Sequence, residues 1–428
     1  MPDTPEAVPD FVTISRIGAD GDGIAAGTSD KPRYFPFTLP GEDVSLATPP
    51  ILLTTSIDRV APPCPHFGTC GGCTLQHWRD EPYAAWKASL LADALRRAGF
   101  DPSTSGEAPI APLVRTPPEA RRRIDLAIRR HGGTLTVGLH KRGSSTDIID
   151  LEACTILHPT LAGLIAPLRQ MLRSLATFKR EGSAVLNLLD TGPDLLLRTD
   201  APATTGDRVR LAAFAATHGI PRIALAIGIG KLPPEIASQH SRPSVIFDGT
   251  PVTPPPGAFL QASAPAEAAI RAAVLAGLPT KLTSKSRFAE LYAGNGTLTF
   301  ALSNSARVDA FEGDAAAAAG LRDGVNAAAR AGRIAVHTRD LTRQPLSVKD
   351  FAAFAAVILD PPFAGAGPQM ATLAASAVKR VIYVSCNPAA LAREARLLHD
   401  AGFKLLSATP VDQFLWSARL EAVCVFGR

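Results

Sequence analysis

From about Gly257 to the last residue, Arg428, the chain alternates short apolar runs with alanine-rich segments. The apolar runs FAELYAG, RVDAFEGD, AAVILDPPF and RVIYVSCNP each carry Gly, Asp or Pro at or near the end. Runs of this length are typical of strands buried on both faces, and the segments between them have a helical composition. The alternation predicts an α/β fold with a mostly parallel, Rossmann-like sheet covered by helices on both faces.

The rest of the 428-residue chain predicts two further domains. Residues 1–60 hold short strands with glycine turns, which favours a small OB-like β-barrel or a β-rich appendage that only stabilises the rest. Residues 61–255 are expected to form a central α/β domain, and residues 256–428 hold the predicted sheet. A helix is predicted over 82–100, with a stop at Gly99.

Composition limits the classes of protein. The chain is 46% hydrophobic and 19% charged, so it can bury sizeable cores and is not a disordered chain. A net charge of +5 permits a polyanionic partner without proving one. No apolar stretch of about 18 residues predicts a membrane span, and the acidic N-terminus lacks the pattern of a secretory signal. We therefore expect a cytoplasmic protein whose six cysteines serve as ligands or nucleophiles.

A nucleoside cofactor is predicted at the first strand of the sheet. The strand FAELY runs into AGNGT, where Gly294 and Gly296 allow a tight turn and a close approach to a ligand. The next strand ends at Glu312, which suits the hydroxyl groups of a ribose, and Asp340 follows the strand after that, where it could meet an adenine edge. Because the loop lacks the dinucleotide and phosphate-loop motifs, S-adenosylmethionine is favoured over NAD or ATP.

A nucleophile is predicted on the same edge of the sheet. Asp360 ends one apolar run and Cys386 ends the next, followed by Asn-Pro. A thiolate beside S-adenosylmethionine suits methylation of carbon 5 of uracil, since attack at carbon 6 makes carbon 5 nucleophilic. A base must then remove the carbon-5 proton, and Glu421 at the start of the last strand is the candidate. Cys424, inside an apolar run, is interpreted as a core residue.

The segment 257–428 resembles the RNA uridine-5 methyltransferases that act on tRNA and on 23S ribosomal RNA. The resemblance rests on FLQ, ELYAGNGTLTF, FEGD, LDPPF, YVSCNP and the closing LE, which occur in the family's order. It implies a class I methyltransferase domain with Cys386 as nucleophile and Glu421 as base. It also implies a cofactor and uracil site lined by Gln261, Tyr292, Glu312 and Asp360, and Thr297 stands where some members use Asn against the cofactor.

Three positions depart from the family's pattern. Phe363 stands where Arg is usual, Arg419 where His is common, and Ser263 where Asn is often found. These departures affect substrate contacts and leave the proposed nucleophile, base and cofactor acid in place. The Asp-Pro-Pro-Phe sequence also matches amino-group methyltransferases, but that activity would leave the Cys386 motif without a role.

Four cysteines upstream form a candidate ligand set: Cys64, Cys70, Cys73 and Cys154. Four-thiolate zinc sites usually show two close pairs, whereas here the fourth cysteine is isolated. The spacing therefore favours a 4Fe–4S cluster over zinc. The resemblance covers CPHFGTCGGCTLQH and EACTILHP, where some ribosomal-RNA members of the family hold such a cluster, and we expect it to staple two distant segments.

RNA is the expected partner. The segment EARRRIDLAIRRHGG is rich in arginine, and on a strand Arg121 and Arg123 would share a face that could line a backbone groove. The N-terminal unit resembles the small TRAM barrel that some family members carry as an RNA-binding domain. We expect 23S ribosomal RNA as substrate and a monomeric enzyme. The alternatives are tRNA, amino-group methylation, a non-catalytic RNA-binding protein and an iron–sulfur redox enzyme.

Overall fold

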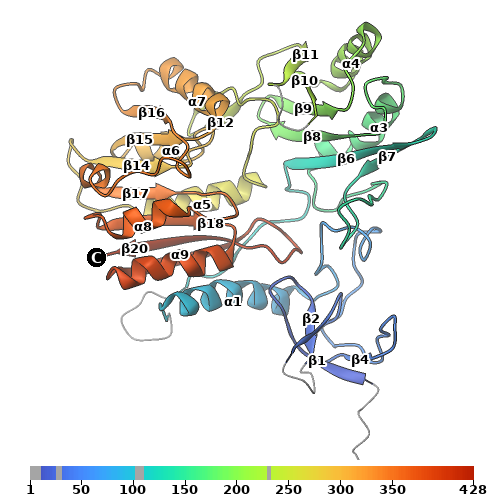
Figure 1. The fold of residues 1–428 in the computed structure, drawn as a ribbon, viewed down its shortest axis with the longest axis horizontal. Coiled ribbons are helices and arrows are strands. Elements are labelled where there is room, and N and C mark those ends of the chain that lie inside the picture. The colour runs from blue at the N-terminus through green and yellow to red at the C-terminus, as the bar shows by residue number, and fades with distance from the viewer. Residues whose placement is uncertain (1–10, 26–30, 102–109, 229–232) are drawn as a thin grey trace, which may run out of the picture.

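The computed structural model describes residues 11–25, 31–101, 110–228 and 233–428. Within them the strands form three large sheets and one two-stranded hairpin (Figure 1). Parts of the predicted N-terminal barrel, residues 1–10 and 26–30, lie outside the described residues. None of the helices in this part of the chain combines the length and hydropathy that crossing a membrane requires.

The largest sheet is formed mainly by the C-terminal part of the chain and is mostly parallel. Its strands from β16 to β18 are parallel, and β20 is antiparallel to both of its neighbours. The order is β16 (Ile334–Thr338), β15 (Arg307–Glu312), β14 (Arg287–Leu291), β17 (Ala356–Leu359), β18 (Arg380–Ser385), β20 (Glu421–Gly427), β19 (Lys404–Asp412) and β5 (Val114–Arg115). The predicted α/β fold is confirmed.

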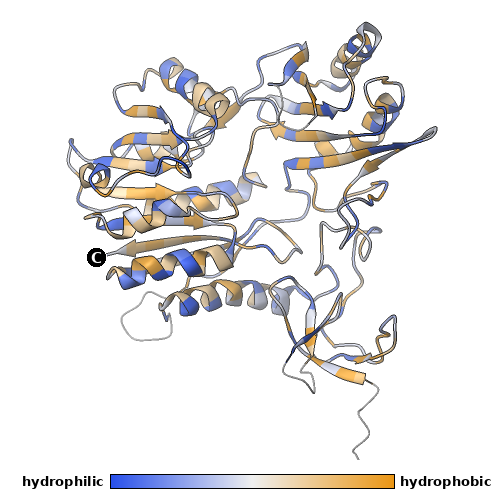
Figure 2. Cartoon of the chain, in the orientation of Figure 1, coloured by the Kyte–Doolittle hydropathy of each residue, from blue (hydrophilic) through white to orange (hydrophobic). Residues whose placement is uncertain are grey.

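Helices cover both faces of this sheet, which explains why its strands are continuous apolar runs. Neighbouring residues of β17 point to different cores: Leu359 belongs to one buried cluster and Ile358 to another. Figure 2 shows these strands as largely hydrophobic ribbons between mixed helices. One face packs against α1 (Asp80–Ala98), α8 (Pro368–Ala374) and α9 (Pro388–Asp400), and the other against α5 (Ala264–Ala276), α6 (Thr299–Ser303) and α7 (Ala315–Ala327).

Helix α1 lies far upstream of the sheet in sequence but belongs to the core of the sheet. Its buried Leu91 and Leu95 share a cluster with Leu398 of α9, and the two helices lie side by side in Figure 1. The helix ends where Gly99 adopts φ 96°, a left-handed conformation that glycine takes without strain. Because β5 also joins the edge of this sheet, the sheet draws on residues well before 256.

The central region forms a six-stranded, mainly antiparallel sheet within the described residues. Its order is β11 (Glu235–Gln239), β10 (Arg222–Ile227), β9 (Gly192–Thr199), β8 (Glu181–Leu189), β6 (Arg123–His131) and β7 (Thr134–Gly138). The accompanying helices are α2 (Pro159–Ala162), α3 (Ile165–Arg173) and α4 (Thr205–His218), and the hairpin is β12 (Val245–Phe247) with β13 (Thr250–Val252). The hairpin packs on the core of the C-terminal sheet through Val245, Phe247 and Val252.

The N-terminal part forms an antiparallel sheet in the order β3 (Arg33–Phe35), β2 (Gly23–Ala25), β1 (Phe11–Ile17) and β4 (Asp43–Ser45). Closure of this sheet into an OB-like or TRAM-like barrel stays a prediction. Ile17 of β1 packs against Trp78, Tyr83 and Leu415 in one buried cluster. The N-terminal sheet is therefore joined both to α1 and to the loop between β19 and β20.

Candidate active site

The predicted site residues lie at one edge of the C-terminal sheet. β15 ends at Glu312, Asp360 follows β17, and Cys386 follows β18. In an open parallel sheet the carboxyl ends of the strands form the rim where ligands bind. β20 runs antiparallel to β18, so its first residue, Glu421, reaches the same rim, and Ala422 pairs with Ser385 beside Cys386.

The loop after β14 has the backbone of a ligand-binding turn. Tyr292, Gly294 and Gly296 all have positive φ values of 63°, 57° and 99°. A Cβ on Gly294 would meet no atom within 4 Å, so the loop leaves open space there, whereas a Cβ on Gly296 would come within 2.6 Å of Leu321. The backbone at Gly294 therefore leaves room for a ligand, whereas Gly296 packs closely against α7.

Glu312 braces this loop from the neighbouring strand. Its two carboxylate oxygens accept hydrogen bonds from the backbone amides of Gly294, at 2.7 Å, and Asp314, at 2.6 Å. Asp340 differs: it accepts bonds from Thr342 and Arg343 in its own turn, and its contribution to a ligand stays a prediction.

A small pocket behind this loop contains an acid that the sequence analysis did not single out. The pocket is lined by Phe259, Glu290, Leu291, Tyr292, Ala293, Gly294, Asn295, Thr297, Leu298, Ile358 and Asp360. Burial raises the pKa of Glu290 to about 8, and its Oε2 atom has no hydrogen-bond partner among the described residues. A charged residue inside the apolar strand FAELY was the signal in the sequence. An unpaired buried acid beside a glycine turn fits a polar ligand that supplies the missing partner.

A chain of side-chain amides joins the two acids of the site. Gln261 Nε2 donates to Asp360 Oδ2 at 2.9 Å, and Gln261 Oε1 accepts from Gln413 Nε2 at 3.0 Å. Gln413 also donates from Nε2 to Glu421 Oε2, while its Oε1 accepts from the backbone amide of Ala262 at 2.9 Å. Gln413 is thus fixed at both polar atoms. Sequence reasoning missed it, because it lies in no motif.

Gln261 is itself held from the central domain. Arg122 Nε donates to the carbonyl of Gln261 at 3.0 Å, and its guanidinium pairs with Glu267 of α5. Ser263, one of the departures from the family's pattern, is the N-cap of α5 and accepts a bond from Ala266 at 3.3 Å. Arg122, in the first part of the arginine-rich segment, is therefore a buried residue that positions the site.

Burial dominates the electrostatics of this chain of contacts. It raises the pKa of Asp360 to about 7 and raises the pKa of Glu421 well above its ordinary value, with Asp360 adding to the rise in Glu421. Burial raises the pKa of the Cys386 thiol to about 12, and the acids Glu421 and Asp360 add to the rise. The cation Arg419 lowers the same pKa. Oε1 of Glu421 is buried without a hydrogen-bond partner among the described residues, so one oxygen is available to take a proton.

The residues around Cys386 connect it to a second loop. Asn387 is the N-cap of α9 and accepts a bond from Ala389 at 3.0 Å, and its Nδ2 donates to the carbonyl of Phe363 at 2.9 Å. The guanidinium carbon of Arg419 lies 4.3 Å from the centre of the Phe363 ring. The two departures Phe363 and Arg419 therefore contact one another. Cys424 is fully buried in β20, as predicted for a core residue.

The four upstream cysteines line one small pocket, shared with His66, Gly72 and Gln76. The segments that carry them are already joined, since Gly71 donates to the carbonyl of His140 at 2.9 Å and Glu152 donates to His66 Nε2 at 3.1 Å. In the described part of the chain, no three His, Cys, Asp or Glu side chains are close enough to hold a single metal ion. A cubic cluster holds its thiolates farther apart than one zinc ion does.

Two cavities meet at Arg419, and the larger one is also lined by Asn387, the residue after Cys386. One of about 890 Å³ is bounded by β1, α1 and the start of α9, and one of about 310 Å³ lies beside the cysteine-bearing segment. Both are lined by Asp20, Ala418 and Arg419. The first also contains basic residues and an aromatic pair: Arg16, Arg96, Arg97, Trp78 and Trp86. A basic cleft with aromatic side chains suits a single-stranded nucleic acid.

The arginine-rich segment contributes less to these cavities than the sequence suggested. Of its arginines, Arg121 alone lines either cavity. Arg130 is used inside the protein, where it donates to the carbonyl of Phe178 at 2.8 Å, and Arg142 pairs with Asp22.

The fold and the site define a class I S-adenosylmethionine-dependent methyltransferase. The structure of the tRNA (uracil-54, C5)-methyltransferase of Pyrococcus abyssi, solved with S-adenosyl-L-homocysteine, matches it with a TM-score of 0.72. The match covers 97% of this chain and 100% of that one, and at 20% sequence identity it shows the fold alone. The family described as tRNA (Uracil-5-)-methyltransferase matches residues 326–428.

Relatives along the whole chain identify the family. An uncharacterized RNA methyltransferase of Rhizobium meliloti is 38% identical, over 96% of this chain and 98% of its own length. A 23S rRNA (uracil(1939)-C(5))-methyltransferase of Chromohalobacter salexigens is 33% identical, over 99% of this chain and 90% of its own. The chain belongs to the RNA uracil-5 methyltransferases, enzymes that act on RNA with S-adenosylmethionine as methyl donor.

Proposed function

We propose that this enzyme methylates carbon 5 of a uridine in 23S ribosomal RNA through a covalent adduct of Cys386, with Glu421 as the base. The observation that carries the proposal is the arrangement at the rim of the sheet. Cys386 follows β18 and Glu421 begins the adjacent β20, and a chain of amides ties Glu421 to Asp360. The likeness to a 23S ribosomal RNA methyltransferase along nearly the whole chain supports the choice of RNA.

In this mechanism Cys386 acts first. Its sulfur forms a bond to carbon 6 of the uracil, and the electron pair of the carbon 5–carbon 6 double bond moves toward the carbonyl at carbon 4. Carbon 5 becomes nucleophilic and takes the methyl group, whose bond to the sulfonium sulfur of the donor would break to leave a neutral thioether. Glu421 then removes the proton from carbon 5, the double bond re-forms, and the bond to sulfur breaks to free Cys386. A carboxyl group with a raised pKa is suited to holding that proton near neutral pH.

Binding of the methyl donor is assigned to the pocket after β14. S-Adenosylmethionine, when bound, supplies an electrophilic methyl group. We assign Glu312 to the ribose hydroxyls and Asp340 to the adenine side. The remaining contacts are assigned to Gln261, Tyr292, Gly294, Gly296, Thr297 and Asp360, to which the structure adds Glu290. The buried, unpaired Oε2 of Glu290 and the open space at Gly294 are what support this fit.

The four cysteines are proposed to hold a 4Fe–4S cluster. Four thiol groups around one pocket, from residues as distant as Cys64 and Cys154, provide the donor set that such a cluster takes, and the isolated fourth cysteine favours the cluster over zinc. The cluster would supply covalent cross-links between the two segments. Its position beside the smaller cavity supports a role in shaping the RNA site.

The RNA is proposed to enter through the two cavities that meet at Arg419. We infer three domains near the predicted boundaries, 1–60, 61–255 and 256–428, with α1 assigned to the last. The N-terminal sheet, proposed to be a TRAM-like barrel, forms one wall of the larger cavity. We propose that the enzyme works as a monomer in the cytoplasm, where ribosomal RNA is made accessible during assembly.

Methyl transfer to RNA tests the proposal. Purified protein is incubated with labelled S-adenosylmethionine and 23S ribosomal RNA or tRNA, and the product nucleoside is identified by mass spectrometry. We expect 5-methyluridine in 23S RNA, complete loss with Cys386→Ala, and retention with the control Cys424→Ala. Equal methylation by Cys386→Ala and wild type would refute the nucleophile. Methylation of tRNA alone would refute 23S ribosomal RNA as the substrate, and methylation of an amino group would refute carbon 5 of uridine as the target.

A further inference from the structure

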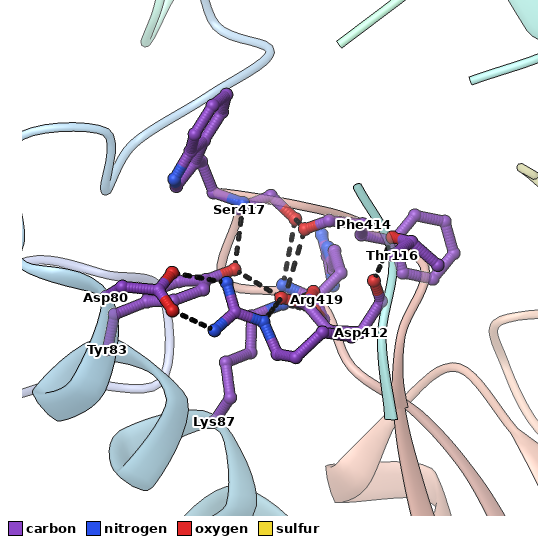
Figure 3. A network of polar contacts seen from close by, with 10 residues as sticks. Asp80, Tyr83, Lys87, Thr116, Asp412, Phe414, Ser417 and Arg419 are labelled. Carbon is purple, nitrogen blue, oxygen red and sulfur yellow. Dashed lines mark hydrogen bonds and ion pairs between the residues drawn. The ribbon is translucent and has the colours of Figure 1, made fainter. Parts of the chain in front are cut away.

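Helix α1 reaches into the loop between β19 and β20 with a fully buried lysine. Lys87 Nζ donates to Asp412 Oδ1 at 2.8 Å and to the carbonyl of Phe414 at 3.3 Å, and it also donates to the carbonyl of Arg419 (Figure 3). Both charged side chains of the Lys87–Asp412 pair have no exposed surface. One ammonium group therefore ties together the beginning and the end of the segment 412–419.

Further bonds hold the same segment. Tyr83 OH donates to Asp412 Oδ2 and accepts from the backbone amide of Trp416, each at 2.8 Å. Thr116 Oγ1 donates to the carbonyl of Asp412 at 2.5 Å. Figure 3 shows Lys87 and Tyr83 rising from α1 toward this loop. A buried ion pair adds little net stability, but either charge left without its partners is costly, so these bonds favour the one backbone arrangement that satisfies both groups.

The segment ends at Arg419, whose guanidinium contacts the loop that is bonded to the residue after Cys386. Arg419 lies over the Phe363 ring, and the carbonyl of Phe363 is bonded to Asn387, the residue next to Cys386. Within the described residues no carboxylate lies within ion-pair distance of the Arg419 guanidinium. The positive charge of Arg419 is therefore available to the site and to the two cavities that Arg419 lines.

We propose that Arg419, held over Phe363 by the anchor of Lys87, is the cation that stabilises the thiolate of Cys386. Arg419 and Lys87 are positioning residues of this reaction, which makes α1 part of the machinery. The inference rests on the proposed role of Cys386 as nucleophile. It gives a function to a buried lysine that touches neither the methyl-donor pocket nor the reacting thiol.

The two acids that face Cys386 work against its ionisation. Glu421 from β20 and Asp360 after β17 are acids, and Tyr383 on β18 interacts with the same thiol. Burial and the two acids raise the pKa of Cys386, whereas Arg419 lowers it. A cation at this position is what a buried thiol flanked by acids needs in order to ionise.

The test measures the thiol itself. The full-length protein is alkylated with iodoacetamide across a range of pH, and modification of the Cys386 peptide is followed by mass spectrometry without RNA. Arg419→Met should raise the apparent pKa of alkylation by about half to one pH unit, or slow it about three- to tenfold at fixed pH. Arg419→Lys should restore most of the wild-type profile, and Arg396→Met, which removes an exposed cation of α9, should not change it.

Lys87→Met should shift the profile in the same direction as Arg419→Met. If the Lys87→Met variant does not fold, the double variant Lys87→Met/Asp412→Asn takes its place. It removes both buried charges and should give the same shift. Glu81→Gln, which removes an exposed charge of the same helix, should leave the profile unchanged. A wild-type profile in Arg419→Met would overturn the inference, as would a wild-type profile in the folded Lys87 variants. If Cys386→Ala loses methylation while Arg419→Met keeps the wild-type alkylation profile, the proposed function stands and the inference is refuted.

Discussion

Gln413 donates a hydrogen bond to Glu421, across the gap between the end of β19 and the start of β20. Because the same amide group also donates to Gln261 and its oxygen accepts from a backbone amide, the orientation of Gln413 is fixed. One oxygen of Glu421 is thereby occupied and the other is left unpaired. Gln413 thus determines which oxygen of the proposed base faces the substrate.

Gln413→Leu should lower kcat about 10- to 100-fold, because it keeps the volume of the side chain but removes the bond that orients Glu421. The KM for S-adenosylmethionine should rise by a smaller factor, because Gln413 also holds Gln261, which is assigned to the methyl donor. Steady-state kinetics on 23S RNA measure both constants, with circular dichroism as the control for folding. An unchanged kcat in the folded variant would show that the orientation of Glu421 does not depend on Gln413.

Glu421→Gln should trap the covalent adduct. The variant keeps the shape of the side chain and can still form the bond from Cys386 to carbon 6, but it cannot accept the proton from carbon 5. We expect a protein–RNA complex that survives denaturing electrophoresis and carries the transferred methyl group. The double variant Glu421→Gln/Cys386→Ala is the control and should form no complex. Free methylated RNA released at the wild-type rate would exclude Glu421 as the base.

Methylation should become faster as the pH rises. Cys386 reacts as a thiolate and Glu421 as a carboxylate, and burial raises the pKa of both groups. The reactive form of each group therefore increases with pH, and we expect kcat/KM to rise from about pH 6 to about pH 9. The measurement is the pH profile of kcat/KM at saturating methyl donor. A profile that falls over this range would require a group that acts in its protonated form.

Leu95→Ala should destabilise the catalytic sheet. Leu95 of α1 has no exposed surface and packs in the cluster that includes Leu398 of α9 and Phe426 of β20. Loss of its side chain should reduce the free energy of unfolding by about 2–5 kcal/mol. Leu275→Ala on α5, where 37% of the residue is exposed, should cost less than about 1 kcal/mol. Urea denaturation of both variants measures the difference, and equal losses would count against the packing of α1.

Cys154→Ser should remove the proposed cluster. The protein purified without oxygen should contain about four iron and four sulfide ions per chain, and the variant should contain almost none. Cys424→Ser is the matched control and should keep its iron, because Cys424 lies in β20 away from the other cysteines. Metal and sulfide analysis decides the question. One zinc ion per chain in the wild type would replace the cluster with a zinc site.

The sequence alone predicted the parallel sheet and the ends of its strands. Glu312 and Glu421 lie at the strand positions that the apolar runs indicated, and Asp360 and Cys386 directly follow their strands. This was possible because strands buried on both faces leave continuous apolar runs, and because the carboxyl ends of parallel strands meet at one rim. The motif around Cys386 then indicated the chemistry.

Only the tertiary structure decided which residues support that chemistry. Lys87 and Asp412 lie 325 positions apart, and Gln413 belongs to no motif, so no local pattern joins them. Periodicity reports which face of an element is buried, but contacts between distant elements depend on how those elements pack. For this reason the strand ends were readable from the amino-acid order, whereas the anchoring of the loop by α1 was not.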